Sequence, residues 1–167
     1  MRKNLLPYLL SLLCLLSCIK EKQTGADLAV GDRIPDFSVT MNDGTIVTGE
    51  QLRQGTSFIM FFTTVCEDCR KTLPQVQTVY NLYKDNGVRF VLISRSEGPE
   101  SIQTHWSEHK FTMPYSAQTG SGIYELFART RVPRIYICQD GIIKSMFTDD
   151  PVPTAESLVL SLDGSDI

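Results

Sequence analysis

Residues 57–69 read SFIMFFTTVCEDC, an apolar run followed by two cysteines three positions apart. The run at 57–63 is typical of a strand buried on both faces, and the cysteines come where a helix is expected to begin. On the first turn of a helix, Cys66 and Cys69 lie on one face, close enough to close a disulfide and to reopen it. The first thiol lies at the positive end of the helix dipole, which favours the thiolate. The stretch predicts redox chemistry at a strand-to-helix junction.

The same spacing also serves zinc sites and structural disulfides. A zinc site would need two further ligands, but Cys14, Cys18 and Cys138 form no second C-x-x-C pair, and His105 and His109 lie far along the sequence. A structural disulfide would close too small a loop to stabilise the fold much. The two histidines are four positions apart on an expected helix without a third ligand, so we interpret them as a solvated face. We expect neither a metal nor a cofactor.

The N-terminus has the pattern of an export signal. A charged start at residues 1–3 precedes a leucine-rich core at 5–16, and Cys18 follows. The core has about a dozen residues, too few to span a bilayer as a helix, which favours a cleaved signal over a retained anchor. The pattern resembles a bacterial lipoprotein signal, which implies that residues 1–17 are removed and that Cys18 carries the lipid. The polar residues 18–29 are expected to form a flexible tether.

Residues 30–167 suffice for one ordinary domain with a proper core. The net charge of −3 gives no basic field for nucleic acid, so we expect no such partner. Export would place the chain where disulfides persist. We therefore expect it in the bacterial cell envelope, held to the membrane by lipid on Cys18 and facing the periplasm.

The domain alternates strand and helix patterns, as α/β sheets with helices on their faces do. Further strands are expected at 36–40, 45–48, 88–94, 134–139 and 142–147. Helices are expected at 67–85, 100–110, 121–130 and 153–162, with one helical turn at most at 50–54. Pro74 should kink the first long helix, and Cys138 falls in a strand, where we interpret it as a buried, inert thiol.

Several motifs together resemble the thioredoxin superfamily, and within it the TlpA- and ResA-like thiol-disulfide oxidoreductases of bacterial envelopes, which are related to AhpC/TSA proteins. In family order these motifs are residues 30–37, the turn at 42–44, the strand and dithiol at 61–71, Pro74, and Val132-Pro133. The resemblance covers residues 30–165. It implies a thioredoxin fold, with a central mixed β-sheet flanked by helices and an N-terminal β-hairpin extension.

The resemblance also assigns roles. It implies that Cys66 is the nucleophile, that Cys69 resolves the intermediate, and that a cis peptide bond before Pro133 faces them. Substrate would bind along Val132, Pro133 and Val65. The implied partners are a disulfide-bearing envelope protein as substrate and an unidentified electron-donating thiol protein.

Three positions depart from the family pattern. Val65 stands where the family usually has tryptophan, which changes one wall of the substrate surface. Met60 replaces the buried acid of thioredoxins, and Thr72 replaces a glutamate common in TlpA-like proteins. The sequence therefore shows no inherited proton shuttle for the second thiol.

The acids between the cysteines bear on the direction of the reaction. Negative charge on Glu67 and Asp68 disfavours the thiolate of Cys66 and so makes the reduced form less stable. We expect a reductant, with a potential nearer about −270 mV, as in thioredoxin, than about −120 mV, as in the oxidant DsbA.

Two other functional classes remain as alternatives. A peroxiredoxin-like thiol peroxidase would share Thr63 three positions before Cys66, but its family has a proline where this chain has Ile59. A non-catalytic metal-binding thioredoxin-like protein, such as a copper-delivering protein of the Sco type, has more widely spaced cysteines and a distant histidine. Peroxide turnover and copper titration distinguish these classes.

Overall fold

The computed structural model describes residues 27–164 of the chain. The predicted signal peptide, Cys18 and the predicted tether up to residue 26 lie outside the described residues. Asp27 and Leu28, which we predicted to belong to the tether, are packed against the fold: the N–H of Leu28 donates to the carbonyl of Phe127, and the Leu28 side chain is buried. The packed domain thus begins before residue 30. Between residues 27 and 164, no helix is long and apolar enough to cross a membrane.

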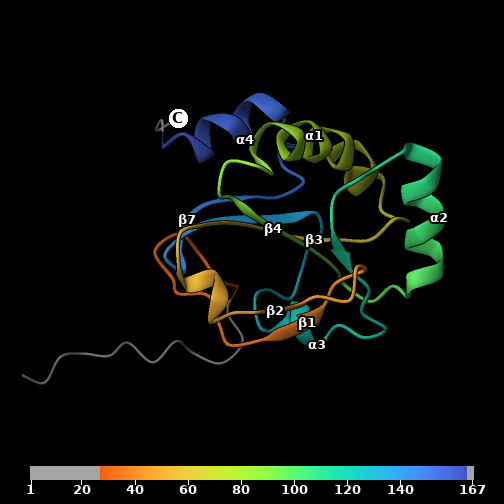
Figure 1. Cartoon of the computed structure of the whole chain (residues 1–167), viewed down its shortest axis with the longest axis horizontal. Helices are drawn as coiled ribbons and strands as arrows, with labels where there is room; N and C mark the ends of the chain where they lie inside the picture. Colours follow the sequence, from red (N-terminus) through yellow and green to blue (C-terminus); the bar gives the residue numbers. More distant parts are fainter. Residues whose placement is uncertain (1–26, 165–167) are drawn as a thin grey trace, which may run out of the picture.

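A mixed five-stranded sheet with the order β5-β4-β3-β6-β7 forms the centre of the molecule (Figure 1). The central strand β3 (Thr56–Phe62) is parallel to β4 (Arg89–Ser94) and antiparallel to β6 (Arg134–Gln139). β5 (Tyr115–Ser116) extends the parallel side, and β7 (Ile142–Phe147) extends the antiparallel side. The predicted fold class, an α/β fold with a mixed sheet flanked by helices, is confirmed.

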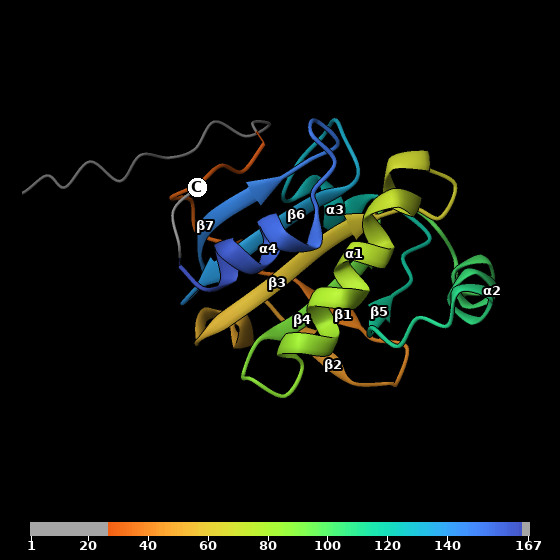
Figure 2. The same cartoon turned by 90° about the horizontal axis from the view of Figure 1, so that it is seen from above.

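Helices cover one face of the sheet. α1 (Glu67–Tyr83) and α4 (Ala155–Leu162) lie over this face, and α2 (Pro99–His109) lies at the β5 side (Figures 1 and 2). Alternate side chains of β3 point toward the helices and pack with Cys69 and Leu73 in one buried cluster. Burial of this apolar strand on both faces agrees with its continuous run of apolar residues.

The predicted hairpin lies on the opposite face, with β1 (Ser38–Thr40) antiparallel to β2 (Ile46–Thr48). A short 3₁₀ turn, η1 (Gln51–Arg53), and a single helical turn, α3 (Gly122–Glu125), complete this layer. The other side chains of β3, among them Phe61, pack here in a second buried cluster. The sheet is thus sandwiched between two apolar layers.

The predicted helix at 121–130 is wrong beyond its first turn, because α3 ends at Glu125. The N–H of Ala128 still donates to the carbonyl of Tyr124, but the next N–H, that of Arg129, donates to the carboxylate of Asp27 at 2.8 Å. Backbone groups that would continue the helix are thus engaged by the N-terminal segment. Such long-range partners carry no local sequence signal.

Two other differences have local causes. The sequence pattern does not predict β5, because two residues after Pro114 are too few to show strand periodicity. The last helix begins at Ala155 rather than Pro153, because Thr154 is its N-cap. The Thr154 hydroxyl accepts a hydrogen bond from the N–H of Ser157 at 3.2 Å, and the Ser157 hydroxyl accepts one from the N–H of Thr154 at 3.1 Å.

Candidate active site

The two cysteines follow the carboxyl end of the central strand, β3. The loop at residues 63–65 connects β3 to α1, and Cys66 is the N-cap residue of that helix, with extended backbone angles of φ −78° and ψ 125°. Its carbonyl accepts the N–H of Arg70 at 3.0 Å. Cys69 lies in the first turn, so both thiols are fixed by the start of one helix, where the free N–H groups lie.

The two thiols differ in exposure. Cys66 is partly exposed and Cys69 is fully buried, and both are free cysteines. Burial raises the pKa of the Cys69 thiol well above its ordinary range; a hydrogen bond from the Thr63 backbone opposes the rise, and the neighbouring Cys66 adds to it. A partner from solvent therefore reaches Cys66 first. The raised pKa favours the protonated form of the buried Cys69 thiol.

The loop before β6 faces the reachable thiol. The Sγ atom of Cys66 lies 3.4 Å from the carbonyl oxygen of Val132, close enough for the thiol to donate a hydrogen bond. The peptide bond between Val132 and Pro133 is cis, and Pro133 is buried directly before β6. Val65 is 81% exposed beside Cys66. The structure thus brings Cys66 and Val132 together and leaves Val65 as an apolar surface next to them.

Glu67 and Asp68 are not isolated charges. Lys71 forms ion pairs with both, at 2.9 Å to Glu67 and 3.3 Å to Asp68. The hydrogen bond from Lys71 also holds the pKa of the Glu67 carboxyl below its ordinary value. Lysine four positions after a glutamate is a recognisable helical pair, so the sequence did contain this signal. Arg70 also lowers the pKa of Glu67, so Lys71 and Arg70 together offset part of the negative charge that Glu67 and Asp68 place beside Cys66.

The two positions where the family carries acids are both buried. Met60 packs in the apolar cluster under α1, with Cys69. The hydroxyl of Thr72 donates to the carbonyl of Asp68 at 2.7 Å. Neither side chain offers a carboxylate to the buried thiol.

Glu97 is a site residue that the sequence analysis missed. Its carboxylate accepts the N–H of Thr64 at 2.7 Å and also accepts the Thr64 hydroxyl. Thr64 is buried and lies two positions before Cys66. Because β3 and β4 are parallel, the residues that follow them meet at one edge of the sheet. An acid shortly after the strand expected at 88–94 could therefore have been predicted to lie near the dithiol.

Cys138 lies too far from the dithiol to join it. It pairs in register with Ser57, at the opposite end of β3 from Phe62, which places it about 16 Å along the strand. It is fully buried, and burial raises the pKa of its thiol to about 12.

The predicted solvated histidines lie near the end of α2. The rings of His105 and His109 are 4.0 Å apart between centroids, and His109 Nδ1 lies 2.9 Å from the His105 carbonyl oxygen. Burial is the largest cause lowering the pKa of His105. Within residues 27–164, no group of three or more His, Cys, Asp or Glu side chains is placed to hold a metal ion.

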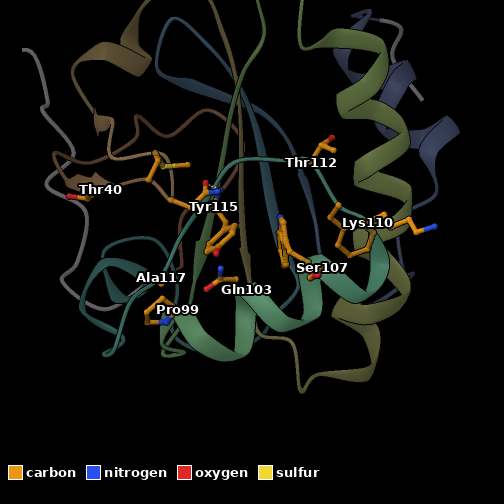
Figure 3. A pocket seen from close by; sticks show the side chains of 12 residues that line it. Thr40, Pro99, Gln103, Ser107, Lys110, Thr112, Tyr115 and Ala117 are labelled. Atoms are coloured by element: carbon orange, nitrogen blue, oxygen red, sulfur yellow. Dashed lines mark hydrogen bonds between the residues drawn. The ribbon is translucent and has the colours of Figure 1, made fainter.

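A cavity of about 720 Å³ lies away from the dithiol, between α2, the segment at 110–117 and the end of β1 (Figure 3). Gln103, Ser107 and Tyr115 line it, whereas none of the described cysteines does. Of the two thiols of the dithiol, only that of Cys66 is partly exposed, whereas that of Cys69 is buried.

The model of the Redoxin family matches residues 29–159. Among curated relatives, the thiol-disulfide oxidoreductase ResA of Bacillus cereus is 23% identical over 115 residues, which make up 68% of this chain and 66% of the relative. The chain thus spans just under two thirds of the length of that relative.

Solved structures share the fold. The thioredoxin domain of a thiol-disulfide oxidoreductase from Bacteroides vulgatus superposes with a TM-score of 0.67 at 20% identity, covering 80% of this chain and 97% of that one. StoA from Bacillus subtilis gives a TM-score of 0.65 at 19% identity, with coverages of 77% and 96%. These likenesses support the thioredoxin-like fold.

Proposed function

The chain belongs to the Redoxin family, and we propose that it acts as a thiol-disulfide oxidoreductase that reduces protein disulfides through Cys66 and Cys69. One observation carries the proposal: a reachable and a buried thiol share one helical turn, and the reachable thiol faces the carbonyl of Val132. This asymmetry suits a reaction in which one thiol attacks and the other resolves.

In the first step the Cys66 thiolate attacks one sulfur of a substrate disulfide. The substrate S–S bond breaks, a mixed disulfide forms between Cys66 and the substrate, and the other substrate sulfur leaves as a thiolate that takes a proton. The carbonyl of Val132 lies beside the reacting sulfur, where it can accept a backbone N–H of an extended substrate segment. Val65 offers that segment an exposed apolar contact.

In the second step Cys69 loses its proton and attacks Cys66. The mixed disulfide breaks, the second substrate thiolate leaves, and Cys66 and Cys69 become joined as a disulfide. The substrate has gained two electrons and two protons, and the dithiol has lost them. A separate thiol protein must then return two electrons, which makes an electron-donating dithiol partner part of the proposal.

The reducing direction rests on local charge. Glu67 and Asp68 place negative charge beside the dithiol, partly offset by Lys71, and such charge favours the uncharged disulfide over the reduced form. The partial neutralisation by Lys71 makes this effect smaller than two free acids would give.

The place of action is the bacterial cell envelope, with the domain facing the periplasm. The N-terminal sequence supports this part of the proposal through the charged start, the apolar core and Cys18, which would carry the lipid and hold the chain to the membrane. In that compartment substrate disulfides form and persist.

The direct test is reduction of a disulfide-bonded peptide by the pre-reduced protein, followed by counting thiols on both. The wild type should oxidise its dithiol as it reduces the peptide, with Cys66→Ser inactive and Cys138→Ser fully active. Efficient turnover of hydrogen peroxide without peptide reduction would instead establish the peroxidase alternative. Tight copper binding at the dithiol without either activity would establish the metal-binding alternative.

A further inference from the structure

The N-terminal segment holds the loop that faces Cys66, which we call the proline loop (residues 129–133). Asp27 Oδ1 accepts the N–H of Arg129 at 2.8 Å. Asp27 Oδ2 accepts the guanidinium of Arg134 at 2.8 Å and the hydroxyl of Thr130 at 3.2 Å. One carboxylate therefore bonds to the beginning of the loop and to the residue immediately after it.

Arg134 makes this carboxylate hard to replace. The residue is only 4% exposed, and its ion pair with Asp27 places a counter-charge beside the guanidinium. A buried cation without such a partner is strongly unfavourable. Its further contacts include Met146 and Thr130, and neither carries charge. Asp27 is thus the anion that lets a cation sit directly after the proline loop.

The opposite side of the proline loop is tied as well. The hydroxyl of Tyr124 donates to the carbonyl of Arg131 at 2.7 Å, and the next carbonyl, that of Val132, is the one 3.4 Å from Cys66 Sγ. The position of that carbonyl depends on anchors at both ends. Asp27 supplies the anchors at Arg129 and Arg134.

We propose that Asp27 is a positioning residue for peptide substrates: it fixes the proline loop so that a segment paired along Val132 presents its disulfide to Cys66. The proposal rests on the proposed function and extends it, because it makes the N-terminal segment a structural part of the substrate surface. Misplacement of a reacting group by about 1 Å can slow a reaction by up to about a hundredfold. Loss of one of several anchors should therefore cost about tenfold for a substrate that binds along the loop.

The test compares two probes that share a leaving group. One is a short extended peptide whose single cysteine is disulfide-bonded to 5-thio-2-nitrobenzoate, and the other is 5,5′-dithiobis(2-nitrobenzoate), which has no peptide flanks. In both, Cys66 attacks and the coloured thiolate leaves with the electron pair of the broken S–S bond. The ratio of the two rates isolates binding along the proline loop from the reactivity of Cys66.

Asp27→Asn in the full chain keeps an acceptor for Arg129 but removes the counter-charge of Arg134. We expect the peptide rate to fall about tenfold, while the rate with the small probe stays unchanged. Leu28→Ala is the matched control, because it removes a buried side chain of the same segment and leaves the carboxylate in place. It should lower thermal stability without changing the ratio. Asp36→Asn, which removes an ion pair with Arg53 elsewhere, should change neither rate.

If Asp27→Asn is too unstable to purify, Asp27→Glu keeps the negative charge and moves the carboxylate by one methylene, and the same fall in the ratio is expected. An unchanged ratio in the folded Asp27 variant, or an equal fall in Leu28→Ala, overturns the inference and leaves the proposed function standing. If the wild type reacts with the small probe but not with the peptide, both the role of Asp27 and the proposed reduction of peptide disulfides are wrong.

Discussion

The carboxylate of Glu97 accepts both the backbone N–H and the hydroxyl of Thr64, so the residue two positions before Cys66 is tied to the loop after β4. The adjacent Thr63 backbone bonds to the Cys69 thiol and opposes the rise in its pKa. Glu97 thus fixes the loop at 63–65. This loop contacts the buried thiol of Cys69 through the Thr63 backbone and leads directly to Cys66.

Replacing Glu97 with alanine should slow the second half of the reaction. The loop at 63–65 would lose two hydrogen bonds, and the contact from Thr63 to Cys69 would weaken with it. We expect release of reduced substrate from the mixed disulfide to be about tenfold slower, measured by rapid quenching after a single turnover. Glu100→Ala, which removes an exposed acid of α2, is the control. Equal release rates in the Glu97 variant and the wild type would contradict this role.

A Cys69→Ser variant should accumulate its substrate as a mixed disulfide on Cys66, because the resolving thiol is gone while the reachable one remains. Mass spectrometry of the non-reduced adduct should find the bond at Cys66. Cys66→Ser should form no such adduct, and Cys138→Ser should behave as the wild type because Cys138 is fully buried. Trapping through Cys138 would show that the wrong pair of thiols has been chosen.

The charge of Lys71 should tune the redox potential. Lys71→Ala removes the ion pairs of both carboxylates beside Cys66, which favours the uncharged disulfide and should make the protein more reducing. Replacing both acids, with Glu67→Gln and Asp68→Asn, should shift the potential in the opposite direction. Each shift should be below about 30 mV, a factor of ten in the equilibrium constant, because the groups are largely exposed. Shifts of the same sign in the two variants would refute the electrostatic explanation.

The buried thiol of Cys138 should make the reduced protein less stable in alkali. Burial raises the pKa of this thiol to about 12 in the folded state, whereas the pKa of a cysteine thiol in the unfolded chain is about 8.5. The stability that the protonated thiol contributes is therefore complete below about pH 8.5 and is lost progressively as the pH rises toward 12. Between pH 9 and 11 the wild type should lose about 1.4 kcal/mol per pH unit more than Cys138→Ala in urea unfolding. Parallel pH profiles would contradict the buried thiol's role.

The features predictable from the sequence are those that depend on local pattern. The apolar run of β3 identifies a strand buried on both faces, and the cysteine spacing after it places the dithiol on the first helical turn. The hairpin of β1 and β2 and that of β6 and β7 follow from turn residues between alternating strands. Each of these signals lies within a few residues of the element that it predicts.

The missed features depend on residues far apart in the chain. Glu97 reaches Thr64 across 33 positions, and Asp27 reaches Arg134 across 107. The N-terminal segment also engages the N–H of Arg129, four residues after the end of α3 at Glu125. The sequence shows at most that an acid, Glu97, follows the 88–94 strand; it does not identify the partners in such pairings, because they meet only once the sheet has brought the segments together.

The central claim is that Cys66 and Cys69 form a reversible dithiol couple that acts as a reductant. The most direct measurement equilibrates the protein in thiol-disulfide buffers of stepped potential, blocks free thiols after acid quenching, and maps the modified cysteines. We expect a single two-electron transition that joins Cys66 to Cys69, at a potential nearer about −270 mV than about −120 mV, with Cys138 free throughout. A transition above about −180 mV, or no Cys66–Cys69 disulfide at any potential, would contradict the claim.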